Sequence, residues 1–229
     1  MIHQEKHLRS SDFITDVVIG MSDGLTVPFA LAAGISSAVN SNQIVTTAGI
    51  AEVIAGSIAM GLGGYLAGKT ELDHYQSELR REYQEVEMVP EKEKEEIKEI
   101  FADYGFSSEA QTMLANEIAK DKDKWVHFMM RYELGLEEPD AKRAGKSAAT
   151  IGLSYVVGGL IPLLPYFFTD TPVEGLKISA AITLLSLFVF GYFKSKVTGQ
   201  PAIGGAIRVM IIGAVAATAA YLVAKLFGA

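Results

Sequence analysis

Residues 20–39 read GMSDGLTVPFALAAGISSAV, and residues 50–68 read IAEVIAGSIAMGLGGYLAG. Both stretches are apolar over about the length that crosses a bilayer, yet each contains one acidic residue, Asp23 in the first and Glu52 in the second. An ionised carboxylate near the middle of a membrane costs roughly 3 kcal/mol or more, so such residues normally face a cavity, a partner or an ion. The alternative is a structural carboxylate hydrogen-bonded between helices, and we favour a functional pair.

Hydrophobic residues make up 49% of the 229-residue chain and are concentrated in five runs. Each run approaches or exceeds the roughly 20 residues that a membrane-crossing helix needs. The runs are residues 13–39, 44–68, 147–168, 176–193 and 202–227. The sequence therefore predicts an all-α integral membrane protein with five transmembrane helices. Its expected parts are the N-terminus with spans 1 and 2 (residues 1–68), an acidic helical insert (69–146) and spans 3 to 5 (147–229).

The insert contains 20 of the 27 acidic residues of the chain and 13 of its 20 basic residues. Its net charge of −7 therefore equals that of the whole chain. Concentrated negative charge favours cations as partners of the insert and argues against nucleic acid. The chain has no cysteine, which excludes disulfides and thiolate metal ligands.

Lysine and arginine residues near the ends of the spans predict how the spans are oriented. The side expected to be cytoplasmic carries Lys6, Arg9, Lys69, Lys142, Arg143, Lys146, Lys194 and Lys196. The N-terminus and the insert are thus expected in the cytoplasm, and the C-terminus on the far side. Residues 1–12 are polar, without a cleavable signal or a sorting extension, from which we expect a prokaryotic cytoplasmic membrane.

The insert is rich in good helix formers, and its turn residues predict three helices. Residues 71–87 are expected to continue span 2 beyond the membrane until Pro90 interrupts the helix. A second helix is expected over residues 91–104, ending at Gly105. Ser107 or Ser108 is a suitable cap for a third helix, which should run to about residue 134 before Gly135 and Pro139.

Small residues in the spans predict close helix packing. Gly49, Gly56 and Gly63 recur every seven residues, and Gly64 and Gly68 form a further small pair. Span 3 contains four residues that should interrupt or kink its helix, namely Gly158, Gly159, Pro162 and Pro165. Such a kink is compatible with a gate or with simple packing. For Arg208, inside span 5, we favour snorkelling to the cytoplasmic surface over a role in an ion path.

The two membrane carboxylates can share the middle of the bilayer. At a rise of about 1.5 Å per residue, Asp23 lies roughly 15 Å from the cytoplasmic start of span 1, and Glu52 roughly 12 Å from the far-side start of span 2. Oxygen ligands alone suit Mg²⁺ or Ca²⁺, whereas a thioether from Met60 would favour a transition metal such as Fe²⁺. Because a carboxylate must be deprotonated to bind a metal, metal and proton compete for it, which predicts proton-coupled exchange.

Two further aspartates fall within about 40° of Asp23 on a helical wheel and would extend this face towards the entrance. They are Asp12 and Asp16. For Asp12 we favour a helix cap, and for Asp16 an interfacial charge is the alternative.

The insert offers a second candidate metal site. Glu82 and Glu85 are three residues apart, as are Glu93 and Glu96, and Glu133 follows the adjacent pair Met129 and Met130. Each set shares one helical face, so three helices can converge on a metal cluster. Solvated helix faces are the alternative, which we expect for Glu91, Glu95 and Glu99. His74 and His127 are weaker candidates, since a ferritin-like di-iron site needs two Glu-x-x-His pairs and only Glu71 with His74 qualifies.

The sequence resembles the vacuolar iron transporter family, which includes the yeast iron and manganese transporter and prokaryotic homologues. The resemblance is carried by DGLTVPFALAAG (residues 23–34), AEVIAGSIAMGLGGYLA (51–67) and GGLIPLLPY (158–166). It covers nearly the whole chain, including the insert, which some plant relatives lack. It implies a homodimer of five-span subunits that exports Fe²⁺, and often Mn²⁺ or other divalent ions such as Zn²⁺ and Co²⁺, in exchange for protons.

The resemblance also implies site residues. The family's path lies at the dimer interface, and the matching positions are Asp23, Glu52 and Met60. Its cytoplasmic metal-binding domain uses glutamates on three helices with methionines. The residues that fit this pattern are Glu82, Glu85, Glu93, Glu96, Met129, Met130 and Glu133.

Our leading hypothesis is therefore a proton-coupled antiporter for Fe²⁺ and Mn²⁺, with no enzymatic activity and no cofactor. A membrane-anchored ferroxidase or metal-storage protein is the main alternative, although an anchor gains nothing from carboxylates inside the membrane. A passive channel for divalent cations is a third possibility.

Overall fold

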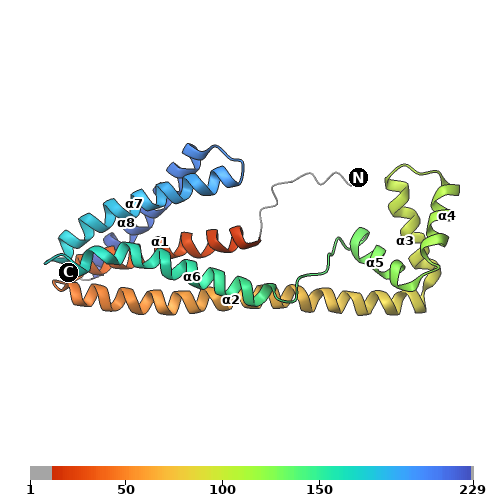
Figure 1. Cartoon of the computed structure of the whole chain (residues 1–229), viewed down its shortest axis with the longest axis horizontal. Coiled ribbons are helices and arrows are strands. Elements are labelled where there is room, and N and C mark those ends of the chain that lie inside the picture. The colour runs from red at the N-terminus through yellow and green to blue at the C-terminus, as the bar shows by residue number, and fades with distance from the viewer. Residues whose placement is uncertain (1–11, 228–229) are drawn as a thin grey trace, which may run out of the picture. The chain divides into compact units, whose positions relative to one another are not determined.

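The computed structural model describes residues 12–227, and five of the helices in that range are long and apolar enough to cross a membrane (Figure 1). They are α1 (Asp12–Ala38), α2 (Asn42–Met88), α6 (Arg143–Leu163), α7 (Pro172–Val197) and α8 (Ala202–Phe227). A short 3₁₀ helix, η1 (Leu164–Phe167), extends α6. The predicted all-helical class is confirmed, with five helices able to span a membrane.

Three shorter helices lie between α2 and α6 in the chain, namely α3 (Pro90–Asp103), α4 (Ser108–Ile118) and α5 (Lys122–Tyr132). As predicted, α2 continues past its apolar part to Met88, and Pro90 is the first residue of α3. Gly105 follows α3 with a φ of +81°, a conformation that glycine adopts without strain. The side chain of Ser107 accepts a hydrogen bond from the backbone N–H of Ala110 at 3.4 Å and caps α4.

The third predicted insert helix is instead two helices, α4 and α5. The chain leaves the helical conformation at residues 119–121, where Asp121 accepts a hydrogen bond from the backbone N–H of Lys124 at 3.2 Å. An aspartate that caps a following helix competes with continuation of the preceding one. The capping aspartate lies in the polar sequence AKDKDK (residues 119–124). Because the helical pattern continues on both sides of this sequence, the break could not be recognised there.

The described residues form two compact units, one containing residues up to Tyr65 and from Ala144 onwards, and the other Leu66–Arg143. In the first unit, apolar side chains of α1, α2 and α6 pack together. A second cluster joins α1 to α7 and α8 around Phe29 and Ala33. In the second unit, the core brings the end of α2 together with α3, α4 and α5. Its buried residues are Tyr75, Val86, Ile97, Ala115, Trp125, Val126, Met129 and Met130.

Most of the glycines predicted to permit close packing do so. A Cβ placed at Gly49 would lie 2.9 Å from Cδ1 of Leu163, and one at Gly64 would lie 2.6 Å from Cδ1 of Ile151, so a larger residue at either position would displace a side chain of α6. Gly63 differs, since a Cβ there would meet no heavy atom within 4 Å. The seven-residue repeat is therefore not a packing stripe along its whole length within this chain.

Span 3 is less interrupted than its composition predicts. The helix α6 runs through Gly158, Gly159 and Pro162, and only after Leu163 does it tighten into η1. Gly158 serves packing, because a Cβ there would lie 3.0 Å from the backbone nitrogen of Leu25 in α1. The change to 3₁₀ geometry at the end of the helix is common and relieves the constraint of a nearby proline.

Candidate metal sites

One tyrosine of α6 packs against both helices that carry the membrane carboxylates. The hydroxyl of Tyr155 donates a hydrogen bond to Oε1 of Glu52 at 2.5 Å. Asp23 directly precedes Gly24, which packs against the backbone of Tyr155. The helices that carry the predicted residues Asp23 and Glu52 thus both pack against Tyr155, which is itself buried.

Glycines on two helices make room for Tyr155. Gly24, the residue after Asp23, lies against the backbone of α6, since a Cβ there would be 2.9 Å from Cα of Tyr155. Gly56, one helical turn after Glu52, lies under the ring, since a Cβ there would be 2.5 Å from Cζ of Tyr155. Each carboxylate is therefore close in sequence to a glycine that leaves space for Tyr155. These glycines set how closely the helices with the two acids approach α6.

Glu52 keeps one oxygen without a protein partner. Its Oε2 is buried and accepts no hydrogen bond from any described residue. A buried carboxylate oxygen without a donor is costly, which suits an atom that binds a proton or a cation. Met60 is half-buried eight residues further along α2, or about 12 Å at 1.5 Å per residue, so its sulfur is not part of the Glu52–Tyr155 group.

The other two aspartates of α1 differ from each other. Asp12 is exposed at the start of the helix. Asp16 is buried, with 5% of its surface exposed, and accepts a hydrogen bond from the hydroxyl of Ser147 in α6 at 2.9 Å. Asp16 is thus a carboxylate covered by α6 rather than one that faces solvent.

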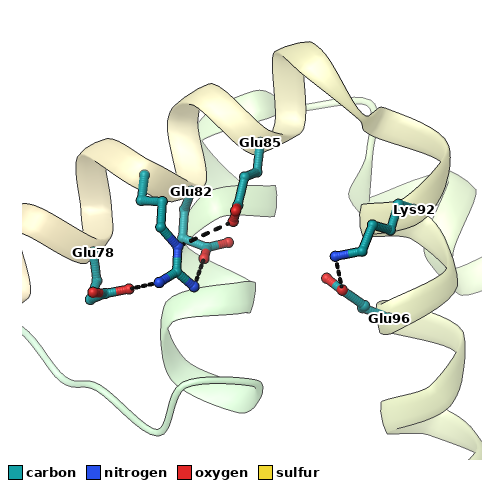
Figure 2. Close-up of polar contacts among 6 residues, drawn as sticks. Glu78, Glu82, Glu85, Lys92 and Glu96 are labelled. Carbon is teal, nitrogen blue, oxygen red and sulfur yellow. Dashed lines mark hydrogen bonds and ion pairs between the residues drawn. The ribbon is translucent and has the colours of Figure 1, made fainter.

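In the insert, five glutamates form two triads that share one residue. One carboxylate oxygen from each of Glu82, Glu85 and Glu93 lies within 4.8 Å of the others, and the same holds for Glu93, Glu96 and Glu133. The carboxylates come from α2, α3 and the residue that ends α5. Figure 2 shows Glu82 and Glu85 on α2, with Glu96 on the neighbouring α3. The structure thus gathers all five predicted glutamates, as the i,i+3 spacing indicates.

Glu82 and Glu93 are the buried members, each with 1% of its surface exposed. None of their four carboxylate oxygens has a hydrogen-bond partner among the described residues. Burial, together with the charge of Glu133, raises the pKa of Glu82 to about 7. Burial, together with the charge of Glu96, raises the pKa of Glu93 to about 7. Buried acidic oxygens without donors provide a hard ligand set for a divalent cation.

Two basic residues already pair with the outer carboxylates. Arg81 lies 2.8 Å from Glu78 and 3.4 Å from Glu85, and its guanidinium approaches Glu82 at 4.0 Å (Figure 2). Lys92 pairs with Glu96 at 2.8 Å (Figure 2). A cation binding to these carboxylates would have to compete with both ion pairs, which lie at the surface and are individually weak.

The remaining insert candidates differ in burial. Met129 and Met130 are buried in the hydrophobic core, with 0% and 1% of their surfaces exposed. His127 is exposed, with Nδ1 2.6 Å from the backbone oxygen of Asp123, and His74 is exposed on α2. The expectation that three other glutamates are solvated is confirmed for Glu91, Glu95 and Glu99.

Three contributors to these sites were not predicted. Tyr155 is an uncharged residue in an apolar run. The only signal in the sequence is Gly56, one turn after Glu52, which leaves room for an aromatic ring of a neighbouring helix. Arg81 and Lys92 each precede a site glutamate by four residues, a spacing that indicates an ion pair on a helix.

This arrangement defines a polytopic membrane protein with acidic sites suited to cations, one between its spans and one in its helical insert. The chain belongs to the VIT family, whose sequence pattern matches residues 14–225. Members of this family are transporters rather than enzymes.

Relatives match the chain over nearly its whole length. The chain is similar to vacuolar iron transporter 1 of Tulipa gesneriana, with 52% identity covering 97% of this chain and 90% of that protein. Vacuolar iron transporter 1 of Arabidopsis thaliana is 51% identical, with 97% and 89% covered. Protein CCC1 of Saccharomyces cerevisiae is 40% identical, with 94% of this chain and 69% of that protein covered.

These relatives correct the expected location. They are eukaryotic proteins, and those of the two plants are named for the vacuole. The expectation of a prokaryotic cytoplasmic membrane is therefore not borne out. It was based on the short polar N-terminus without a sorting extension, a feature that does not distinguish one membrane from another.

The role of Tyr155 leads to a first prediction. Tyr155→Phe removes the hydrogen bond to Glu52, and we expect metal flux in proteoliposomes to fall roughly tenfold, because a hydrogen bond to a charged group is lost. Gly56→Ala should have a similar effect by displacing the ring. Gly63→Ala is the matched control one heptad further along α2, where a Cβ meets no atom of this chain within 4 Å. Equal flux for the two alanine variants would contradict this role.

Proposed function

We propose that this protein is a proton-coupled antiporter that moves Fe²⁺ and Mn²⁺ out of the cytosol, with Zn²⁺ and Co²⁺ as further candidate ions. The observation that carries the proposal is that two apolar helices, each with one carboxylate, pack against Tyr155, whose hydroxyl donates to Glu52. Family membership and the names of the relatives support iron as the transported ion.

The membrane site provides the alternating occupancy that such exchange requires. The free oxygen of Glu52 takes up either a proton or a cation, and Asp23 supplies the second negative charge. Tyr155 fixes the orientation of Glu52 by donating to Oε1, leaving Oε2 for the transported ion. Met60 supplies a soft ligand at another position along the path, which favours transition metals over Mg²⁺ and Ca²⁺.

The insert acts as the cytoplasmic collector. Basic residues near the span ends support a cytoplasmic location for it. Its two glutamate triads bind the divalent cation, with Met129 and Met130 as candidate additional ligands, and pass it to the membrane site. Because the pKa values of Glu82 and Glu93 are about 7, small changes in cytosolic pH shift the insert between proton-loaded and metal-loaded forms.

We further propose that the protein acts as a homodimer. Several large apolar side chains of α2 are exposed in the single chain, among them Ile54, Ile58 and Leu62 at 56%, 65% and 54%. They follow one another every four residues and so lie along one face. Such a face contacts either lipid or a second subunit, and the proposal assigns it to a second subunit.

A flux assay tests the proposed function. Purified protein in liposomes should accumulate Mn²⁺ or Fe²⁺ when an imposed pH gradient favours proton export from the lumen, and collapsing the gradient should stop accumulation. Flux that ignores the pH gradient would instead identify a passive channel. Oxidation of Fe²⁺ without movement across the bilayer would identify the ferroxidase alternative.

A further inference from the structure

A cavity of about 230 Å³ lies where α7 ends and α8 begins. Its walls come from the last turn of α7, the connecting residues and the first two turns of α8. The lining residues that can interact with a ligand are Lys194, Ser195, Gln200, Gly204 and Arg208. The cavity is far larger than the roughly 15 Å³ that a single water needs, so it can hold a polar group together with water.

The two basic residues of this cavity have no acidic partner. No carboxylate lines it, and neither Lys194 nor Arg208 forms an ion pair with any residue in the described range 12–227. Glu174, at the opposite end of α7, is the last acidic residue in the sequence. Two cations that line one cavity repel each other, and an anion between them would relieve that repulsion.

The position of Arg208 strengthens this argument. Lys194 lies in the last turn of α7, where the helix dipole favours a positive charge. Arg208 lies nearly two turns inside α8, where no helix end compensates the charge of its guanidinium, so an anion in the cavity would be its counter-charge. Simple snorkelling of a lone arginine does not explain why it shares a polar cavity with a lysine.

The start of α8 adds uncharged donors. Gly204 lies in the first turn, where backbone N–H groups have no partner within the helix. A Cβ at Gly204 would meet no heavy atom within 4 Å, so this stretch of backbone is open. Gln200 contributes a side-chain amide and Ser195 a hydroxyl. Two cations, a helix start and neutral donors together are the chemistry that recognises a phosphate group.

We propose that this cavity binds a phosphate group, and that its source is an anionic membrane lipid. The cavity lies at the membrane-surface ends of two spans, on the side that the basic residues predict to be cytoplasmic. Basic cavities between transmembrane helices at this level suit the phosphate of a lipid headgroup, whose acyl chains remain in the bilayer.

Lipid binding by the full-length protein tests the proposal. The purified protein in detergent is mixed with phosphatidic acid or phosphatidylcholine, and retained lipid is measured by native mass spectrometry. We expect phosphatidic acid to be retained and the variant Lys194→Gln/Arg208→Gln to bind it roughly 30-fold more weakly. The matched control is Lys177→Gln/Lys225→Gln, which removes the same charge from the opposite ends of the same helices and should bind as the native protein does.

Further measurements separate the possible outcomes. The conservative variant Arg208→Lys keeps the charge and should retain most of the binding. The melting temperature of each variant without lipid is measured as well, because a misfolded variant would show a lowered value. An excess of inorganic phosphate that displaces the lipid supports a phosphate site; binding of inorganic phosphate but not of phosphatidic acid would overturn the lipid source. Equal lipid binding by the two double variants, or equal retention of the two lipids, would overturn the proposal itself.

Discussion

Replacing Asp23 by asparagine is expected to reduce Mn²⁺ flux through the reconstituted protein by roughly 100-fold, and replacing Glu52 by glutamine should have the same effect. Both substitutions keep the size of the side chain and remove its negative charge. A cation that leaves water for the middle of a bilayer loses roughly 3 kcal/mol or more unless a charge compensates it, and that energy corresponds to about 100-fold. Because Glu52 and Asp23 act around the same Tyr155, neither is expected to replace the other.

The control for these variants is Glu174→Gln, which neutralises an exposed carboxylate in the first turn of α7. It changes the net charge by the same amount, and we expect native flux from it. The measurement is the initial rate of Mn²⁺ entry into sealed liposomes at a fixed pH gradient. Native rates in both Asp23→Asn and Glu52→Gln would show that the membrane carboxylates are structural, and the proposed transport path would be wrong.

The spans and the ends of the insert helices could be predicted because they depend on local properties. Length and hydropathy suffice for a membrane span, and the turns at Pro90, Gly105 and Ser107 depend on the conformations of those residues alone. The break before α5 was not predicted. Helical periodicity continues on both sides of Asp121, and this pattern hides the cap that its side chain forms.

The contacts between distant segments could not be predicted in this way. Tyr155 lies about a hundred residues from Glu52 in the sequence, and its hydroxyl has no distinguishing neighbour in the apolar run that contains it. The burial of Asp16 could not be predicted either, because nothing near it in the sequence reveals the hydroxyl of Ser147. The insert glutamates were easier to predict, because i,i+3 pairs on one face of each helix restrict where their carboxylates can point.

Methionines show a further limit of sequence patterns. Met129 and Met130 fit a soft metal site by their position before Glu133, yet both are also core residues that pack with Ile97 and Trp125. A flexible apolar side chain suits either role, so their identity as ligands remains a prediction. The same holds for Met60, which stands on α2 away from the hydrogen bond of Glu52.

Replacing Glu93 by glutamine is expected to weaken metal binding by the insert roughly 100-fold, because this residue belongs to both triads. Glu95→Gln is the matched control on the same helix, where Glu95 is exposed and pairs with Lys98. Titration calorimetry with Mn²⁺ on the full-length protein measures the effect. A background of Asp23→Asn and Glu52→Gln removes the proposed membrane site, so that the remaining binding belongs to the insert. Equal affinities of the Glu93 and Glu95 variants would contradict a shared central ligand.

The pH dependence of the same binding follows from the raised pKa values. Glu82 and Glu93 titrate at about 7, so protons increasingly displace the metal below pH 7, and affinity should be lower at pH 6 than at pH 8. Without metal, the stability of the fold changes with pH in the opposite direction to metal affinity. A carboxyl whose pKa is higher in the folded than in the unfolded state stabilises the fold at low pH, and this contribution is lost as pH rises through about 7. The metal-free melting temperature should therefore fall between pH 6 and pH 8, Mn²⁺ should restore it, and Glu93→Gln should reduce both effects.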